Sequence, residues 1–135
     1  MWSLQVNFPA VVVSGIVIFM IGGLWYSRLL FAKRWVALMG KSEEDLKQAA
    51  PGARPFVFVC ALLTAWAFAV ILNHFSPVTP LRAILLAGLC WVGFAAATSY
   101  GTAMFSGTPK ALWLINSGYN LISFIAAALI LAYWR

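Results

Sequence analysis

The chain has 135 residues, of which 64% are hydrophobic and only 9% are charged. Soluble domains are about half apolar and about a quarter charged, so this composition excludes a water-soluble globular protein. The net charge of +6 could indicate a nucleic-acid partner, but the basic residues lie at the ends of apolar runs and in one loop, where anionic lipid headgroups account for them, so we expect membrane lipids as partners and no nucleic acid.

Four apolar runs dominate the chain. A helix needs about 20 apolar residues to cross a hydrocarbon core about 30 Å thick. The N-terminus lacks the pattern of a cleaved signal peptide, so we expect the first run to be retained as a span. The runs predict an all-α fold, a polytopic four-transmembrane-helix bundle forming one domain, with spans at about 8–31, 55–75, 81–105 and 111–134.

The segment 32–54 between the first two spans is the main polar stretch. Its first half has helical apolar spacing with Lys33 and Arg34 off the apolar stripe, which predicts a short amphipathic helix lying in the membrane interface. Gly40 is predicted to end this helix. The stripe consists of Phe31, Trp35, Leu38 and Met39.

A second short helix is predicted in the other half of this segment. Ser42 is a typical N-cap residue, and three acidic residues follow it in the first turn, where the helix dipole favours negative charge. Pro51 and Gly52 are predicted to end the helix. Pro55 then lies in the first turn of the second span, where proline is tolerated.

Lysine and arginine set the expected orientation, because cytoplasmic loops are enriched in these residues. Seven of the nine fall in or beside the loop between the first two spans and the loop between the last two. The other side has only Arg82 and Arg135. We therefore expect both termini outside the cytoplasm and the segment 32–54 within it.

Small residues recur at four- and seven-residue spacing on three of the spans. In lipid there is little hydrophobic drive for helices to associate, so close approach through small side chains matters more. These stripes predict close helix packing within a bundle, and they exceed what four short helices need, which favours a homo-oligomer. The stripe residues are Gly15, Gly22, Ala61, Ala65, Ala69, Gly93, Ala97 and Gly101.

The most distinctive polar set inside a span is in the last one. Asn116, Asn120 and Ser123 share one helical face. Because amides buried in lipid need partners, this face should point at protein or water. It is either a ladder of hydrogen bonds between helices or the lining of a small polar cavity or oligomer axis; the hydroxyls of 98–102 in the third span have a similar depth and could meet it.

A second candidate site lies where the first span meets the amphipathic segment. Arginine can bind a phosphate with two hydrogen bonds, and aromatic rings could form the walls of such a site. The alternative is ordinary anchoring at the interface, which these residue types also favour. The cluster consists of Trp25, Tyr26, Arg28, Lys33, Arg34 and Trp35.

The sequence offers little for chemistry. Proton-coupled transport usually needs an ionisable group inside the membrane, and all three acidic residues lie in the segment 32–54. His74 has no second histidine or nearby carboxylate with which to bind a metal. No nucleophile–base pair or phosphate loop is present. We expect no enzymatic activity, no cofactor and no metal.

Several short motifs carry a resemblance to a known family. They are Gly-Gly-Leu-Trp-Tyr-Ser at 22–27, Leu-Phe-x-Lys-x-Trp at 30–35, Ser-Glu-Glu-Asp-Leu at 42–46, Trp-x-x-Phe at 91–94 and Phe-Ser-Gly at 105–107. With them the chain resembles, over essentially its whole length, a bacterial membrane family known as domain of unknown function 1761. The resemblance implies a four-span protein of the bacterial inner membrane and supplies no activity or catalytic residue.

Two functions remain as hypotheses. The first is a homo-oligomeric inner-membrane bundle that forms a permeation path or a site for a small ligand or lipid. The second is an accessory or scaffold protein whose segment 32–54 binds a partner or anionic lipid.

Overall fold

The computed structural model describes residues 5–27, 32–40, 43–75 and 79–134, with only the backbone described for 32 and 43–51. Within these ranges the chain forms helices and no β-strand, which confirms the predicted all-α fold. The elements are α1 (Phe8–Trp25), α2 (Ala32–Met39), α3 (Glu43–Asn73), α4 (Pro80–Cys90), the π-helical segment η1 (Trp91–Ala96), α5 (Ala97–Ser106) and α6 (Lys110–Tyr133).

Four helical stretches are long and apolar enough to cross a membrane. They confirm the four spans of the predicted fold and make the chain a multi-pass membrane protein. The stretches are Phe8–Trp25, Gly52–Asn73, Pro80–Ser106 and Lys110–Tyr133. We call Pro80–Ser106, which joins α4, η1 and α5, the third span.

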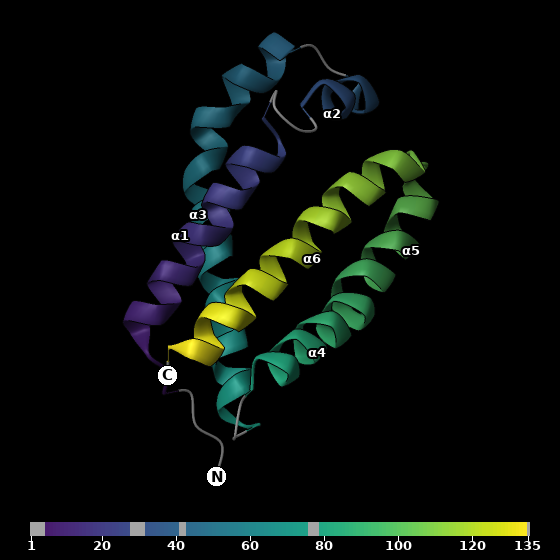
Figure 1. Ribbon diagram of the computed structural model, residues 1–135. Coiled ribbons are helices and arrows are strands. Elements are labelled where there is room, and N and C mark those ends of the chain that lie inside the picture. The colour runs from purple at the N-terminus through teal and green to yellow at the C-terminus, as the bar shows by residue number, and fades with distance from the viewer. Residues whose placement is uncertain (1–4, 28–31, 41–42, 76–78, 135) are drawn as a thin grey trace.

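The last helix, α6, is the centre of the bundle. It lies between the α1–α3 pair on one side and the third span on the other (Figure 1). The helices α1, α3 and α6 contact one another, whereas the third span has α6 as its principal neighbour. The bundle is therefore a three-helix core of α1, α3 and α6 with the third span added beside α6.

Small side chains fill the contacts within this core. Ala61, Ala65 and Ala69, four residues apart on α3, are at most 4% exposed. Gly15 of α1 lies against α3, since a Cβ added there would be 2.6 Å from Leu62 Cδ2. Because helix association in lipid depends on close packing, these contacts hold the core together.

The third span contains one wider turn, η1. The Ala97 N–H donates to the Val92 carbonyl, five residues back, instead of four. This adds one residue to the turn, so the side of the span that faces α6 follows steps of four, four and five residues. The residues on this side are Ala83, Ala87, Trp91 and Ala96.

The small-residue stripe of the third span faces away from α6. Gly93 follows Trp91 by two residues, which is about 200° around the helix, so it points away from the side that packs on α6. Gly93, Ala97 and Gly101 are exposed, and a Cβ added at Gly93 or Gly101 would have no atom of the described residues within 4 Å. The four-residue spacing predicted a close crossing, and within the described part of one chain this stripe is left uncovered.

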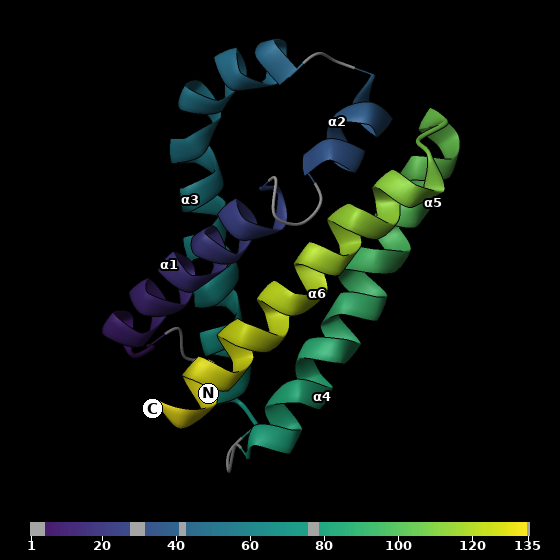
Figure 2. The same ribbon diagram turned by 45° about the horizontal axis from the view of Figure 1, so that its top comes forward.

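The helix α3 runs without a break from Glu43 to Asn73, so the prediction of a separate short helix ending at Pro51 and Gly52 is wrong. A proline removes one helical hydrogen bond and crowds the carbonyl four residues back. Pro51 and Pro55 are four residues apart, so both losses fall on one face, which bends a helix rather than ending it. Figure 2 shows the N-terminal part of α3 turning toward α2.

The first span ends sooner than its predicted limit at residue 31. The helix α1 ends at Trp25, where the Tyr26 N–H donates to the Gly22 carbonyl and the Ser27 hydroxyl donates to the Leu24 carbonyl at 2.6 Å. These bonds occupy carbonyls that the helix end would otherwise leave free. The next helix, α2, ends before Gly40, whose φ is 70°, as predicted.

Candidate functional site

A groove between α5 and α6 brings most of the uncharged polar side chains of these two helices together. Its volume is about 330 Å³. Eight of its nine lining residues carry a hydroxyl, an amide or an indole N–H, and none is ionisable. The residues that define this α5–α6 groove are Ser99, Thr102, Ala103, Ser106, Thr108, Trp113, Asn116, Ser117 and Asn120.

Hydrogen bonds within the groove tie α5 to α6. The Trp113 indole N–H donates to Ser99 Oγ at 2.9 Å, and the Trp113 ring lies edge-on to Tyr100 with centroids 4.9 Å apart. The Thr102 hydroxyl donates to the Thr98 carbonyl of its own helix at 3.2 Å. Each hydroxyl still has acceptor capacity, so the groove can bind a hydrogen-bond donor.

The predicted polar face of α6 divides between two grooves. Asn116 lines the α5–α6 groove, and Ser123 lines a second groove between α3 and α6. Asn120 lines both. Its amide makes no hydrogen bond in the described part of the chain. The face is therefore neither wholly a hydrogen-bond ladder nor wholly one cavity lining.

A bond from the end of the first span holds Asn116. The Tyr26 hydroxyl donates to Asn116 Oδ1 at 2.6 Å, which leaves the Asn116 Nδ2 as the donor that can face the groove. The Tyr26 ring lies edge-on to the Tyr119 ring of α6, with centroids 5.6 Å apart. One contact of the expected ladder thus exists, and its partner comes from the residue that caps α1.

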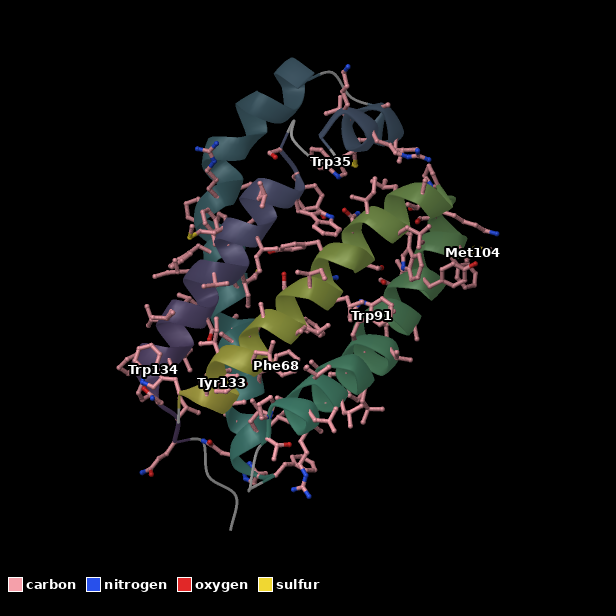
Figure 3. The ribbon with its side chains drawn as sticks, viewed as in Figure 1. Trp35, Phe68, Trp91, Met104, Tyr133 and Trp134 are labelled. Atoms are coloured by element: carbon pink, nitrogen blue, oxygen red, sulfur yellow. The ribbon has the colours of Figure 1, made fainter. Side chains whose placement is uncertain are left out.

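The aromatic residues of the predicted headgroup cluster point into the bundle. The Trp25 indole N–H donates to the Ile115 carbonyl of α6 at 2.9 Å. Trp35 of α2 lies edge-on to Tyr26, with centroids 5.3 Å apart (Figure 3). Because a buried indole or phenol needs a hydrogen-bond partner, these residues dock α2 and the end of α1 on α6.

Two basic members of that cluster, Lys33 and Arg34, point away from the bundle, unlike its aromatic members. Lys33 and Arg34 are exposed on α2, and Arg28 lies outside the described residues. The exposed Arg54 and Lys110 begin the second and fourth spans at the same end of the bundle. The described basic side chains Lys33, Arg34, Arg54 and Lys110 thus lie at the end of the bundle where the α5–α6 groove begins.

Two glycines let the aromatic rings approach. A Cβ added at Gly22 of α1 would be 3.0 Å from the Tyr119 hydroxyl, and one added at Gly118 of α6 would be 3.0 Å from Trp25 Cζ2. The Tyr119 hydroxyl reaches the Ile18 carbonyl at 3.2 Å. At Gly22 the neighbour is therefore the Tyr119 ring of α6, which a side chain at this position would crowd.

A second indole binds α6 from the third span. The Trp91 N–H donates to the Ser117 carbonyl at 2.8 Å (Figure 3). Sequence reasoning did not assign Trp91, Trp113 or Gly118 to the site. A signal existed for Trp113, because it lies three, four and seven residues before Asn116, Ser117 and Asn120 and so shares their helical face. Trp91 lies four and eight residues after the buried Ala87 and Ala83, so it shares their helical face.

The site can form hydrogen bonds but not ion pairs. Among the residues that the structure describes, no group of three His, Cys, Asp or Glu could hold a metal ion. His74 Nδ1 lies 2.8 Å from the Val70 carbonyl of its own helix. Cys60 and Cys90 are free thiols.

Comparison with known families decides what the chain is similar to. The family described as a protein of unknown function (DUF1761) matches residues 9–132. The chain belongs to this family. The match confirms the resemblance stated from the sequence motifs, and DUF1761 carries no assigned activity. No curated protein and no solved structure matches the chain.

Proposed function

We propose that this DUF1761 protein is a non-enzymatic protein of the bacterial inner membrane that takes a small uncharged polar solute into the α5–α6 groove. One observation carries the proposal: eight of nine lining residues offer a hydrogen-bonding group and none is ionisable. Polar groups inside a membrane are costly and often mark function. Because no lining residue carries a charge that could pair with an ion, the proposed solute is neutral and bears several hydroxyl or amide groups.

The groove favours a binding site within each chain over a complete path. Asn120 lies ten residues after the start of α6, at a depth of about 15 Å, which is half of a hydrocarbon core of about 30 Å. From Phe124 to Leu131, α6 is entirely apolar. Passage of a solute would therefore need a second chain, and Gly93, Ala97 and Gly101 offer an exposed surface for close approach.

The charges favour an orientation with the mouth of the groove in the cytoplasm. Lys33, Arg34, Arg54 and Lys110 are at that end, and Arg82 is at the other. Since lysine and arginine are retained on the cytoplasmic side, both termini would lie outside the cytoplasm.

Labelling of engineered cysteines tests whether the groove is open to water. In a Cys60→Ser/Cys90→Ser background, Ser99→Cys should react with a membrane-impermeant maleimide in proteoliposomes. Ala97→Cys, on the exposed outer side of the same helix, is the matched control and should be protected by lipid or by a second chain. Equal labelling of the two positions would overturn the proposal.

Glycerol uptake by proteoliposomes tests passage. If a second chain completes the path, Asn116→Leu/Asn120→Leu should lower uptake to the rate of protein-free liposomes while native mass spectrometry shows unchanged assembly. The control is Ile122→Leu, at an exposed position on α6. A strictly monomeric protein would rule out the homo-oligomer.

The scaffold hypothesis keeps one supporting observation. The exposed Lys33 and Arg34 lie on a helix, α2, that is docked on the bundle through Trp35. A docked helix holds its charged side chains in a fixed position near the lipid headgroups, which favours binding to anionic lipid. Lys33→Gln/Arg34→Gln should then weaken binding to vesicles containing phosphatidylglycerol and leave glycerol uptake unchanged.

A further inference from the structure

The groove between α3 and α6 differs from the α5–α6 groove in its lining. Its volume is about 400 Å³, within the range of about 300–1,000 Å³ that is typical of ligand sites. Most of its walls are apolar, and Phe56 and Val57 at its edge are 75% and 46% exposed. Both lie in the second span, so their exposed surfaces face lipid tails rather than water. We call this hollow the α3–α6 groove.

Polar groups without full partners lie along the α6 side of this apolar groove. Ser123 is 2% exposed, and its Oγ has no hydrogen-bond partner within bonding geometry. The hydrogen of the Tyr119 hydroxyl, one turn earlier, is donated to the Ile18 carbonyl at 3.2 Å. The Asn120 amide is also without a bond in the described chain. Because a buried polar group without a partner is costly, Ser123 favours a polar ligand atom beside it, and the half-buried Asn120 amide can hydrogen-bond the same atom.

Depth restricts the kind of atom. Asn120 and Ser123 lie ten and thirteen residues after the start of α6, about 15 and about 20 Å along the helix. This places them in the middle of a core about 30 Å thick, where an ionised headgroup is too costly to reside. No ionisable acid or base lines the groove to pair with one, apart from the weakly acidic Cys60 thiol and the Tyr119 phenol. The ligand atom is therefore an uncharged oxygen.

We propose that the α3–α6 groove binds a neutral membrane lipid through a hydroxyl or carbonyl oxygen that hydrogen-bonds Ser123 and Asn120, with the apolar tail leaving past Phe56 and Val57. Long-chain isoprenoid alcohols and isoprenoid quinones share this chemistry. Phospholipids and fatty acids do not, because their polar ends are charged and belong at the interface. The proposal goes beyond the solute site of the α5–α6 groove and does not depend on it.

Photo-cross-linking tests the site in the full-length protein. The protein is placed in phosphatidylcholine nanodiscs with an isoprenoid alcohol that carries a diazirine on its tail, and labelled peptides are identified by mass spectrometry. We expect labelling of α3 within 53–64. Unlabelled geranylgeraniol or a quinone with the same tail should compete. Squalane, an isoprenoid hydrocarbon without oxygen, should not.

The two competitors identify the source of the oxygen. Competition by the alcohol alone supports a long-chain alcohol as ligand, and competition by the quinone alone supports a carbonyl lipid. Competition by squalane as strong as by the alcohol would overturn the proposal, because the groove would then only hold lipid tails. Absence of specific labelling on α3 would overturn it as well.

Two hydroxyl deletions form a matched pair. Ser14 of α1 and Ser123 are both buried with an unpartnered Oγ, but only Ser123 lines the groove. Ser123→Ala should reduce labelling by about five-fold, as expected for loss of one hydrogen bond, and Ser14→Ala should leave it unchanged. Retention of bound geranylgeraniol in native mass spectra checks the same ratio without cross-linking. Equal labelling of the two variants would contradict the role of Ser123.

Discussion

The three-helix core and the third span are built from similar apolar residues but are held in place differently. In the 18-residue windows of the other three spans, 28–33% of residues are buried, against 17% in the third span. The core is closed by alanine and glycine contacts, such as Ala65 at 0% exposure. The third span is held at its start by Ala83 and Ala87, and further along by hydrogen bonds involving Trp91 and Ser99.

This difference explains where the polar groove lies. Alanine contacts bring the core helices close together, whereas indole bonds hold two helices together across a wider gap. The groove between α5 and α6 is the space that this second kind of contact leaves, with Trp113 at its wall. The groove within the core, between α3 and α6, is lined mostly by apolar side chains instead.

Enlarging an alanine should separate the two regions most clearly. Ala65→Leu adds a large side chain at a fully buried position of α3, and overpacking of this kind typically costs about 1–3 kcal/mol. Ala97→Leu makes the same change on the exposed side of the third span and should leave the stability of the single chain unchanged. Thermal unfolding in mild detergent measures both.

Ala65→Leu and Ala97→Leu also test whether a second chain covers the exposed side of the third span. If a second chain packs on Gly93, Ala97 and Gly101, then Ala97→Leu lowers the amount of oligomer in native mass spectra without destabilising the chain. Equal loss of stability in Ala65→Leu and Ala97→Leu would contradict the division into core and added span.

Removing an indole donor should affect the third span more than the core. Trp91→Phe deletes the bond to the Ser117 carbonyl and should cost about 1 kcal/mol. Trp25→Phe deletes the equivalent bond to the Ile115 carbonyl, but α1 also packs on α3. Hydrogen exchange should therefore accelerate in the third span for Trp91→Phe and change less in α1 for Trp25→Phe. A larger change in α1 would show that the third span is not the less firmly held of the two regions.

Two hydroxyl deletions in the third span compare a hydrogen bond between helices with one inside a helix. Ser99 accepts the Trp113 N–H, whereas the Thr98 hydroxyl donates only to carbonyls of its own helix. Ser99→Ala should cost about 0.6 kcal/mol, the average for hydrogen bonds between membrane helices, and Thr98→Ala should have a smaller effect. Unfolding in detergent compares them, and red-shifted Trp113 fluorescence in Ser99→Ala alone would confirm a more open groove.

Two adjacent glycines of α1 test how far the Tyr119 ring can move. Gly23→Ala meets no atom within 4 Å and should raise stability by up to about 1 kcal/mol through helix propensity. Gly22→Ala places a methyl group 3.0 Å from the Tyr119 hydroxyl, so displacement of that ring should offset the gain. Thermal unfolding of both variants is sufficient, and a larger gain for Gly22→Ala would show that the ring yields freely.

Hydropathy alone predicted the four spans, because apolar length is a property of the sequence and not of packing. The hydrophobic face of α2 and its end at Gly40 were likewise local properties. The exposure of Gly93 and Gly101 could not be predicted, since the spacing shows that they share a helical face but not which face of the third span packs on α6. The continuity of α3 through Pro51 was missed for a related reason: a proline predicts a lost hydrogen bond but not whether the chain resumes its helix.

The candidate site was predictable in part. The spacing of Asn116, Asn120 and Ser123 identified the polar side of α6, and the hydroxyls of the third span were expected nearby. That Tyr26 would reach Asn116, and that Ser123 would belong to a different groove, depended on the angles at which α1, α3 and α5 meet α6.

Asn120 lines both grooves, so the two proposed sites would be coupled thermodynamically through it. One amide has two donor hydrogens and one acceptor oxygen, so a molecule that engages it from one side changes what remains for a molecule on the other. Such coupling is reciprocal, with the same free energy in both directions. The affinity of the α5–α6 groove for a solute would then vary with the neutral lipid content of the membrane, and Asn120 would be the residue that links the two binding equilibria.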